Sequence, residues 1–254
     1  MTKELGSLRR ANRLIERLIE LETASVTTLA EELEMPTSSV YDYVSTLESL
    51  GYLTRMEDGR YRMSSRLLRL GNEVRHSYDV YTIAEPELSE LAAETGEYVA
   101  LMIEDGGLGV ILSMKQGAKA THVRIDRTYA GTRTRLNTTA AGMAILSRLP
   151  EERACEIVER VGLSRKTENT IVDPEELYEE LERICERGYA VDDEERFEGM
   201  RGVGVPVVSE PDETVAAIAV YGPANRLTDD VIHGELSDRT LQVANVIQVS
   251  LTYS

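Results

Sequence analysis

Three stretches of helical periodicity close to the amino terminus constrain the fold most. Apolar residues recur every three or four positions over residues 8–21, 26–33 and 40–50, the spacing of one apolar stripe along a helix. Thr27 or Thr28 is available as the N-cap of the second helix. The third helix begins at Pro36, where a first turn tolerates proline. These signals predict three consecutive helices, each amphipathic.

A hairpin is predicted directly after the third helix. Gly51 ends that helix, and two short alternating segments follow at residues 52–55 and 60–63. Asp58-Gly59 joins them and is a strong signal for a tight turn, because glycine supplies the positive φ that such a turn needs. Helix, helix, turn, helix and hairpin make a winged helix-turn-helix, whose third helix can enter a DNA major groove. We therefore expect residues 1–63 to be a DNA-binding domain.

Polar residues without a role in this core are the candidates for DNA contact. Small hydroxyls and free backbone N–H groups in a first helical turn can bond phosphates or base edges, and a carboxylate can accept from a cytosine amino group. Arg55 and Arg62 also line the wing. The alternative is that Ser38 and Ser39 only start a helix and that Tyr41 is a surface aromatic. The predicted DNA-binding residues are Thr27, Thr37, Ser38, Ser39, Tyr41, Asp42 and Arg60.

Charge is distributed unevenly along the chain. The net charge is −17, yet residues 1–75 carry a net charge of only −1. Four lysines against 24 arginines, together with the acidity, suggest adaptation to high salt. In such a chain a nearly neutral segment favours contact with a polyanion such as DNA, with chance as the alternative.

The rest of the chain predicts a helical connector at residues 64–80 and a second domain at residues 81–254. Glu85-Pro86 should open a helix that ends at Thr95-Gly96. Beyond it, strands and helices alternate in blocks, which is typical of an α+β domain. The expected strands are 98–103, 110–114, 121–125, 188–191, 203–208 and 215–221, and the expected helices are 138–149, 151–161, 174–187 and 228–251.

Catalytic and metal chemistry have little support in the residues. The two cysteines fall in predicted helices, the three histidines are scattered, and no GxGxxG, P-loop or HExxH pattern occurs. We expect no enzyme activity, no metal and no cofactor. No apolar run approaches the length of a membrane span and no signal segment is evident, so a cytoplasmic protein that does not contact membranes is expected.

Blocks of sequence along almost the whole chain carry a family resemblance. They include Met35-Pro36-Thr37-Ser38-Ser39-Val40, Leu47-Glu48-Ser49-Leu50-Gly51-Tyr52-Leu53, Thr139-Ala140-Ala141-Gly142-Met143-Ala144, Arg187-Gly188-Tyr189-Ala190-Val191-Asp192-Asp193-Glu194-Glu195 and Gly222-Pro223-Ala224-Asn225-Arg226-Leu227-Thr228. In their order and spacing they resemble the IclR family of transcriptional regulators. The acidity and the many arginines indicate a haloarchaeal member.

This resemblance implies a winged helix joined to a GAF-like domain that binds a small-molecule effector. It implies a homodimer or homotetramer on double-stranded DNA with a palindromic operator. It also places the effector in a cleft between a curved sheet and the helix that begins near Thr138. The implied effector-binding residues are Val123, Asp126, Thr134, Ala140, Ala141, Asp192, Met200, Gly202, Ala219 and Tyr221.

The chemistry of some of these residues suits a pocket. Ala140 and Ala141 at a helix start leave room and N–H groups for a carboxylate, with ordinary close packing as the alternative. Asp192 can accept hydrogen bonds from hydroxyls, or it is a solvated turn carboxylate. The family often has a cysteine at the position of Gly202 and serines at those of Ala219 and Tyr221, so the effector's identity does not carry over.

The sequence thus predicts a sequence-specific transcriptional regulator controlled by a small organic or sugar-derived acid. The alternative is a small-molecule-binding or dimerisation module without specific DNA binding.

A histidine is frequent in the family at the position of Asn137, which adds to the differences within the implied pocket region.

Overall fold

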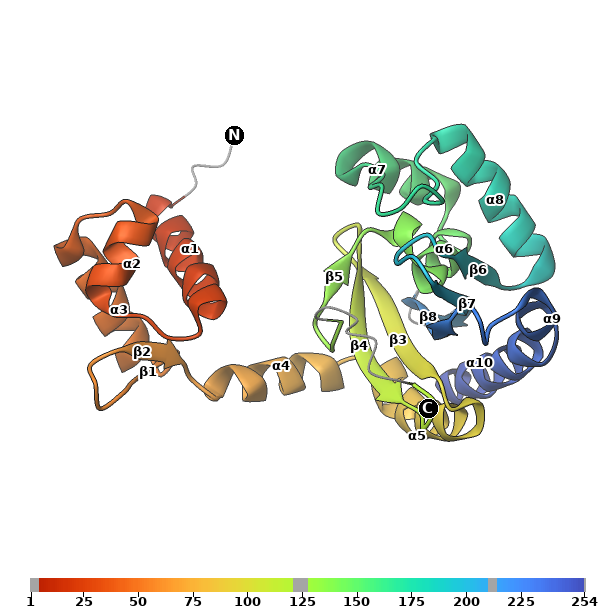
Figure 1. Ribbon diagram of the computed structural model, residues 1–254, viewed down its shortest axis with the longest axis horizontal. Coiled ribbons are helices and arrows are strands. Elements are labelled where there is room, and N and C mark those ends of the chain that lie inside the picture. The colour runs from red at the N-terminus through yellow and green to blue at the C-terminus, as the bar shows by residue number, and fades with distance from the viewer. Residues whose placement is uncertain (1–4, 121–127, 210–213, 254) are drawn as a thin grey trace. The chain divides into compact units, whose positions relative to one another are not determined.

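The computed structural model describes residues 5–120, 128–209 and 214–253, and the chain divides into two compact units, Met1–Val74 and Arg75–Ser254 (Figure 1). The division falls inside the predicted connector. The expected strand at 121–125 and the implied site residues Val123 and Asp126 lie outside the described residues.

The amino-terminal unit contains the predicted three helices and hairpin. Its elements are α1 (Gly6–Leu21), α2 (Val26–Leu33), α3 (Thr37–Ser49), β1 (Leu53–Arg55) and β2 (Tyr61–Met63). The apolar stripes of the helices meet in one core, where Leu14, Leu18 and Leu29 are fully buried. β1 and β2 pair antiparallel, and Gly59 supplies the positive φ at their turn. The winged helix-turn-helix prediction is confirmed.

The N-cap prediction for α2 is wrong by two or three residues. Ser25, rather than Thr27 or Thr28, is the N-cap, and its Oγ accepts a hydrogen bond of 3.1 Å from the backbone N–H of Thr28. The reason is that the helix begins at Val26, so both threonines already lie in its first turn.

The connector also differs from the prediction. α4 (Arg66–His76) ends four residues before Val80, and α5 (Asp79–Thr95) contains Pro86 instead of starting there. The apolar stripe of α5 explains this difference, because its buried residues continue on both sides of the proline, from Val80 to Leu91. Their burial outweighs the hydrogen bond that proline cannot donate.

A six-stranded antiparallel sheet forms the second unit, in the order β5-β4-β3-β8-β7-β6. The strands are β3 (Tyr98–Asp105), β4 (Leu108–Gln116), β5 (Arg133–Thr134), β6 (Ala190–Asp193), β7 (Met200–Ser209) and β8 (Thr214–Pro223). β5 was not among the expected strands. It pairs with β4 over only two residues, too short a segment to show alternation.

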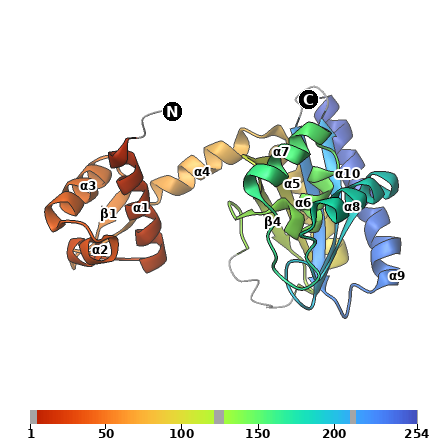
Figure 2. The ribbon, with the colours of Figure 1, turned by 90° about the horizontal axis from the view of Figure 1, so that it is seen from above.

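Helices cover both faces of the sheet (Figure 2). Besides α5, they are η1 (Leu136–Thr138), α6 (Ala140–Leu146), α7 (Glu151–Val161), α8 (Pro174–Arg187), α9 (Asp229–Val231), η2 (Ile232–Leu236) and α10 (Ser237–Thr252). Along β8, Ala216, Ile218 and Val220 pack with α5 and α10, whereas Ala217 and Ala219 pack with α6. The two-residue alternation of a strand therefore separates two cores. This arrangement confirms the predicted α+β class.

Two predicted helices are interrupted. The helix expected at 138–149 begins with the 3-10 turn η1 and is α-helical only over α6. The helix expected at 228–251 is divided because Gly234 has φ −127° and ψ −114°, which no helix accommodates. No helix within the described residues is long and apolar enough to cross a membrane.

Gly204 on β7 sets the distance between α6 and the sheet. A Cβ at this position would lie 2.3 Å from the carbonyl carbon of Ala140 and 2.6 Å from the nitrogen of Ala141. Backbone atoms cannot give way as a flexible side chain does. Only glycine permits this close approach.

Gly204→Ala should therefore lower the free energy of unfolding of the second unit by about 1–3 kcal/mol, the usual cost of overpacking a core. Urea unfolding followed by circular dichroism measures the change. Gly71→Ala on α4 is the matched control, because a Cβ there meets nothing within 4 Å and should stabilise the helix slightly. Equal stability of Gly204→Ala and the native protein would contradict the close approach.

Candidate functional site

α3 presents a polar face on the side opposite its buried residues. Val40, Val44 and Leu47 point into the core. The expected DNA-contacting residues Thr37, Ser38, Tyr41 and Asp42 are exposed, as is Thr27 on α2, while Ser39 is half-buried. Tyr41 is 57% exposed.

Ser45 extends this polar face and was missed by the sequence reasoning. It is exposed and lies three residues after Asp42 and seven after Ser38, hence on the same side of the helix. The helical spacing could have identified it. Residues 37–49 contain no lysine or arginine, so the exposed polar face of α3 offers hydroxyls, the phenol of Tyr41 and the carboxylate of Asp42.

Arg60, the other expected DNA-contacting residue, is bound within its own wing. Its Nε lies 2.7 Å from Asp58 Oδ2, and its Nη1 donates to Thr23 Oγ1 at 2.8 Å. The backbone N–H and the guanidinium of Arg60 lower the pKa of the Asp58 carboxyl. The neighbouring Arg62 forms no side-chain hydrogen bond or ion pair with any described residue. Its guanidinium is therefore more available to DNA than that of Arg60.

An apolar cavity of about 50 Å³ lies in the second unit, between the sheet and α6. It brings together seven of the ten implied effector-binding residues, which are Ala140, Ala141, Asp192, Met200, Gly202, Ala219 and Tyr221. We call it the effector cavity. Thr134 lies outside it, in an adjoining polar hollow.

Several residues that the sequence reasoning missed also line the effector cavity. Met102 and Ile111 complete its apolar wall, and Thr128 has a buried hydroxyl that lacks a partner within the described residues. Arg196 and Phe197 line both this cavity and the polar hollow. A signal existed for these two, since an arginine and the only phenylalanine of the chain directly follow an acidic run.

Asp192 lies on the cavity wall rather than in a solvated turn. Its Oδ1 accepts a hydrogen bond of 2.8 Å from the backbone N–H of Glu195. Burial raises the pKa of Asp192 to about 7, although two backbone N–H groups and the charge of Arg196 act in the opposite direction. Around neutral pH its charge is thus sensitive to the surroundings.

Glu195, whose backbone N–H donates to Asp192, is buried, and its exposed fraction is 9%. Burial, reinforced by the charge of Asp192, raises the pKa of Glu195 to about 9. One of its carboxyl oxygens has no hydrogen-bond partner in the described part of the chain. The neutral, protonated form is therefore favoured in the folded protein.

Arg196 brings a cation to the boundary of the two cavities. Its Nη1 donates to Thr134 Oγ1 at 2.6 Å, and its guanidinium lies 5.1 Å from the ring centre of Phe197. Burial lowers the pKa of this guanidinium. Arg196 can orient an anionic group, because the other N–H donors of its guanidinium have no hydrogen-bond partner among the described residues.

Tyr221 on β8 lines the cavity and stacks on a second tyrosine. The rings of Tyr221 and Tyr98 stack with centroids 5.4 Å apart, and the Tyr221 hydroxyl lies 2.9 Å from Met114 Sδ. Burial raises the pKa of Tyr221. The phenol is therefore neutral in the folded protein, and its O–H donates to Met114 Sδ.

The start of α6 is closely packed. This agrees with the alternative given for Ala140 and Ala141, which was ordinary helix packing rather than the binding of a carboxylate. Thr139 Oγ1 caps the helix by accepting from the N–H of Gly142 at 2.9 Å, and the backbone of Ala140 and Ala141 lies against Gly204. Both alanines still line the cavity. Within the described ranges, no group of three or more His, Cys, Asp or Glu side chains could hold a metal ion.

The raised pKa of Glu195 predicts a pH dependence of stability. Between its ordinary value of 4.5 and about 9, the folded protein binds a proton that the unfolded chain releases. The free energy of unfolding should therefore fall as pH rises across this window. Asp192 contributes in the same direction up to about pH 7.

Glu195→Gln keeps the shape of the neutral carboxyl and removes its titration. We expect the variant to be more stable than the native protein at about pH 8 and to lose the slope between about pH 7 and 9. Urea unfolding midpoints over this range measure it. Glu198→Gln, on an exposed neighbour, should retain the native slope. A native slope in Glu195→Gln would contradict the assignment.

Comparisons with known proteins agree with these features. Residues 72–249 match the family described as Bacterial transcriptional regulator IclR C-terminal, and residues 7–57 match the IclR helix-turn-helix domain. A probable HTH-type transcriptional regulator ArcR of Halobacterium salinarum is 27% identical, over 98% of this chain and 95% of the relative. The HTH-type transcriptional repressor AllR of Salmonella typhi is 30% identical, over 84% of this chain and 79% of the relative.

A solved structure gives the same result over the full length. The crystal structure of the Thermotoga maritima IclR is similar with a TM-score of 0.83 and 33% sequence identity, covering 98% of this chain and 100% of that one. These relatives are regulators rather than enzymes, as the sequence predicted. The resemblance seen in the sequence is thereby confirmed, and the chain belongs to the IclR family of transcriptional regulators.

Proposed function

We propose that this regulator binds a palindromic operator as a homo-oligomer and that a small organic or sugar-derived acid controls the binding. In this proposal residues 1–63 bind DNA and residues 81–254 bind the effector. Residues 64–80 connect these two domains. The observation that carries the proposal is the presence of two separate sites in two compact units: the polar face of α3 and the effector cavity.

The polar face of α3 supports direct reading of bases. Its exposed hydroxyls, phenol and carboxylate can donate to or accept from base edges, whereas none of them attracts phosphate through charge. Arg62 on the wing is available for the DNA backbone. Recognition of this kind depends less on counterion release and suits a protein that acts in high salt.

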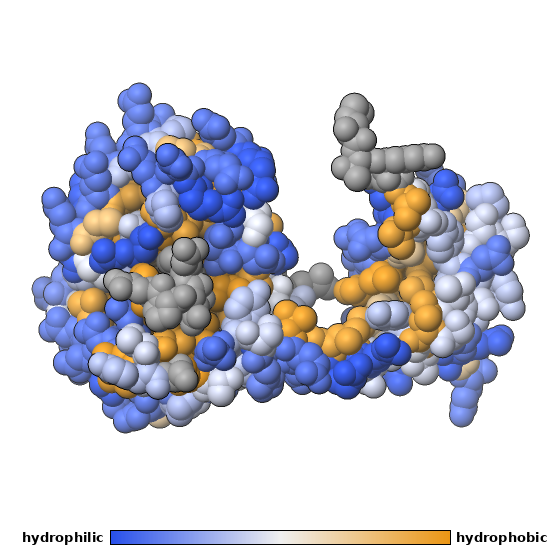
Figure 3. Space-filling view, turned by 180° about the vertical axis from the view of Figure 1, so that it is seen from behind, coloured by the Kyte–Doolittle hydropathy of each residue, from blue (hydrophilic) through white to orange (hydrophobic). Residues whose placement is uncertain are grey.

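Exposed apolar side chains in the amino-terminal unit support the homo-oligomer. Leu8 on α1 is 66% exposed, and Leu68 on α4 is 72% exposed. α4 buries none of its residues, although it has apolar positions on one side, and Figure 3 shows such side chains along it. A second copy of the chain can cover them, which would present two winged helices to a two-fold symmetric operator.

The effector cavity supports a small anionic ligand. Its wall is apolar except for a few polar groups, among them Arg196, Asp192 and the hydroxyl of Thr128, which lacks a partner within the described residues. A carboxylate can pair with the guanidinium, and a hydroxyl can donate to Asp192. The polar groups thus fit a hydroxy acid or sugar acid of few atoms.

The double variant Ser38→Ala/Ser39→Ala should bind operator DNA more weakly, by about fivefold for each hydrogen bond of roughly 1 kcal/mol that is lost. Fluorescence anisotropy on the chain's own upstream DNA, as a full palindrome and as a half-site, measures this. Ser49→Ala is the control, since Ser49 lies at the other end of α3 and bonds to the carbonyl of Thr46. Unchanged affinity would exclude Ser38 and Ser39 from the interface, and absence of binding by the native protein would contradict specific DNA recognition.

Ala219→Val adds two methyl groups to the wall of a cavity of about 50 Å³. DNA binding should remain as in the native protein, while the response to an effector should weaken by about tenfold or more, since little free volume remains. Carboxylic acids and sugars are first screened for one that changes native DNA binding, and that compound is then titrated against the variant. Ala93→Val, on an exposed position of α5, is the control. A native response in Ala219→Val would place the effector elsewhere.

A further inference from the structure

A polar hollow of about 390 Å³ adjoins the effector cavity, and we call it the basic hollow. Four cations line it: Arg133, Arg135, Lys166 and Arg196. Two hydroxyls, of Thr134 and Ser164, lie between them. No carboxylate lines it in the part of the chain that the structure describes, although acidic residues outnumber basic ones by 45 to 28 in the sequence.

The positive charge of the basic hollow is only partly compensated. Arg133 pairs with Asp105, with Nη1 and Oδ2 3.0 Å apart. The side chains of Arg135 and Lys166 form no ion pair or hydrogen bond with any described residue. Most other arginines of the second unit pair with carboxylates, for example Arg226 with Glu97. Two cations that line one hollow without a partner among the described residues are unusual in such an acidic chain. They favour the binding of an anion from outside the protein.

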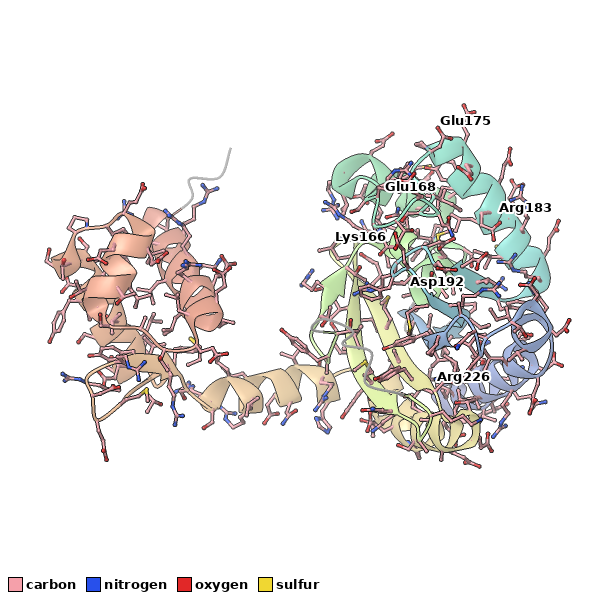
Figure 4. The ribbon with its side chains drawn as sticks, viewed as in Figure 1. Lys166, Glu168, Glu175, Arg183, Asp192 and Arg226 are labelled. Atoms are coloured by element: carbon pink, nitrogen blue, oxygen red, sulfur yellow. The ribbon has the colours of Figure 1, made fainter. Side chains whose placement is uncertain are left out.

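The loop that carries Lys166 is held in place by buried hydrogen bonds. Asn137 is 2% exposed, and its Nδ2 donates to the carbonyl oxygens of Ser164 and Ile171 at 3.2 and 2.8 Å. Figure 4 labels Lys166 in this loop between α7 and α8, and Asp192 on β6. Asn137 is a buried residue of η1, so these bonds join the backbone of the loop to η1.

The same loop is bonded to the segment that precedes Arg196. Thr167 Oγ1 donates to the carbonyl of Glu194 at 2.7 Å, and Thr170 Oγ1 donates to that of Glu195 at 2.6 Å. These bonds fix the backbone that carries Lys166 relative to the backbone that carries Arg196. A backbone that is already held in place reduces the conformational entropy lost when an anion binds to the side chains it carries.

We propose that the basic hollow binds the phosphate or carboxylate group of an anionic metabolite, and that Arg135 and Lys166 are its main ligands. Arg196 and Phe197 line both spaces, so one molecule can place one anionic group in the hollow and extend into the effector cavity. The identification of this molecule with the effector rests on the proposed function, whereas anion binding itself does not. The hollow thus selects effectors with a second anionic group.

The test measures anion binding to the full chain without DNA. Inorganic phosphate and malonate are titrated separately by calorimetry, at constant potassium chloride concentration. We expect at least one of them to bind, and Arg135→Gln and Lys166→Gln each to weaken that binding by about five- to tenfold, as for the loss of a charge-assisted hydrogen bond. Binding of phosphate alone assigns a phosphorylated metabolite, and binding of malonate alone assigns a dicarboxylate.

Arg165→Gln is the matched control. It removes the same charge one residue away from Lys166, but Arg165 bonds to the carbonyl of Glu168 and does not line the hollow. Its affinity should stay within about twofold of the native value, since an exposed charge outside the site adds little. No binding of either anion, or an equal loss in all three variants, overturns the proposal. Operator binding measured in parallel separates this outcome from a failure of the proposed function.

Discussion

The contact between the backbone of α6 and β7 at Gly204 is the constraint on which the second unit depends. Because a glycine stands opposite Ala140, the helix lies closer to the sheet than side chains would permit. Small residues on the same face, Gly202 and Ala219, then leave the space that becomes the effector cavity. The side chains on this face of β7 and β8 are small. Their small size explains both the tight packing at one end of α6 and the free volume beside it.

Charge is organised around that space in a way that differs from the rest of the molecule. Elsewhere in the second unit, most of the described arginines are paired with carboxylates, as Arg239 is with Glu94. At the cavity, burial makes Glu195 neutral and brings the pKa of Asp192 close to neutrality, so the field of Arg196 is weakly opposed. The adjoining basic hollow extends the same positive field. An acidic protein can in this way keep a local preference for anions.

Much of the architecture could be predicted from the sequence. α7 and α8 have the predicted bounds because amphipathic periodicity, Asp173 as N-cap and Gly188 as C-cap all agree locally. Errors occurred where distant contacts outweigh local signals: Pro86 lies within α5 because a buried apolar stripe continues through it, and the two residues of β5 are a strand only because β4 lies beside them. In the candidate site, the family resemblance indicated Asp192 and Tyr221. Arg196 was missed, because its position between two cavities depends on the fold of a distant loop.

The sequence by itself determined the winged helix, the α+β class and the family, because helical and strand periodicities, turn glycines and ordered motif blocks are local properties of the chain. Only the tertiary structure decided which side chains share a cavity and which cations remain unpaired. Among the described residues, it left the side chains of Arg135 and Lys166 without a partner in one hollow, while it bound Arg60 to Asp58 and Thr23 within the wing. The physical reason is that burial and charge compensation depend on neighbours brought together by folding, and no spacing along the chain specifies them.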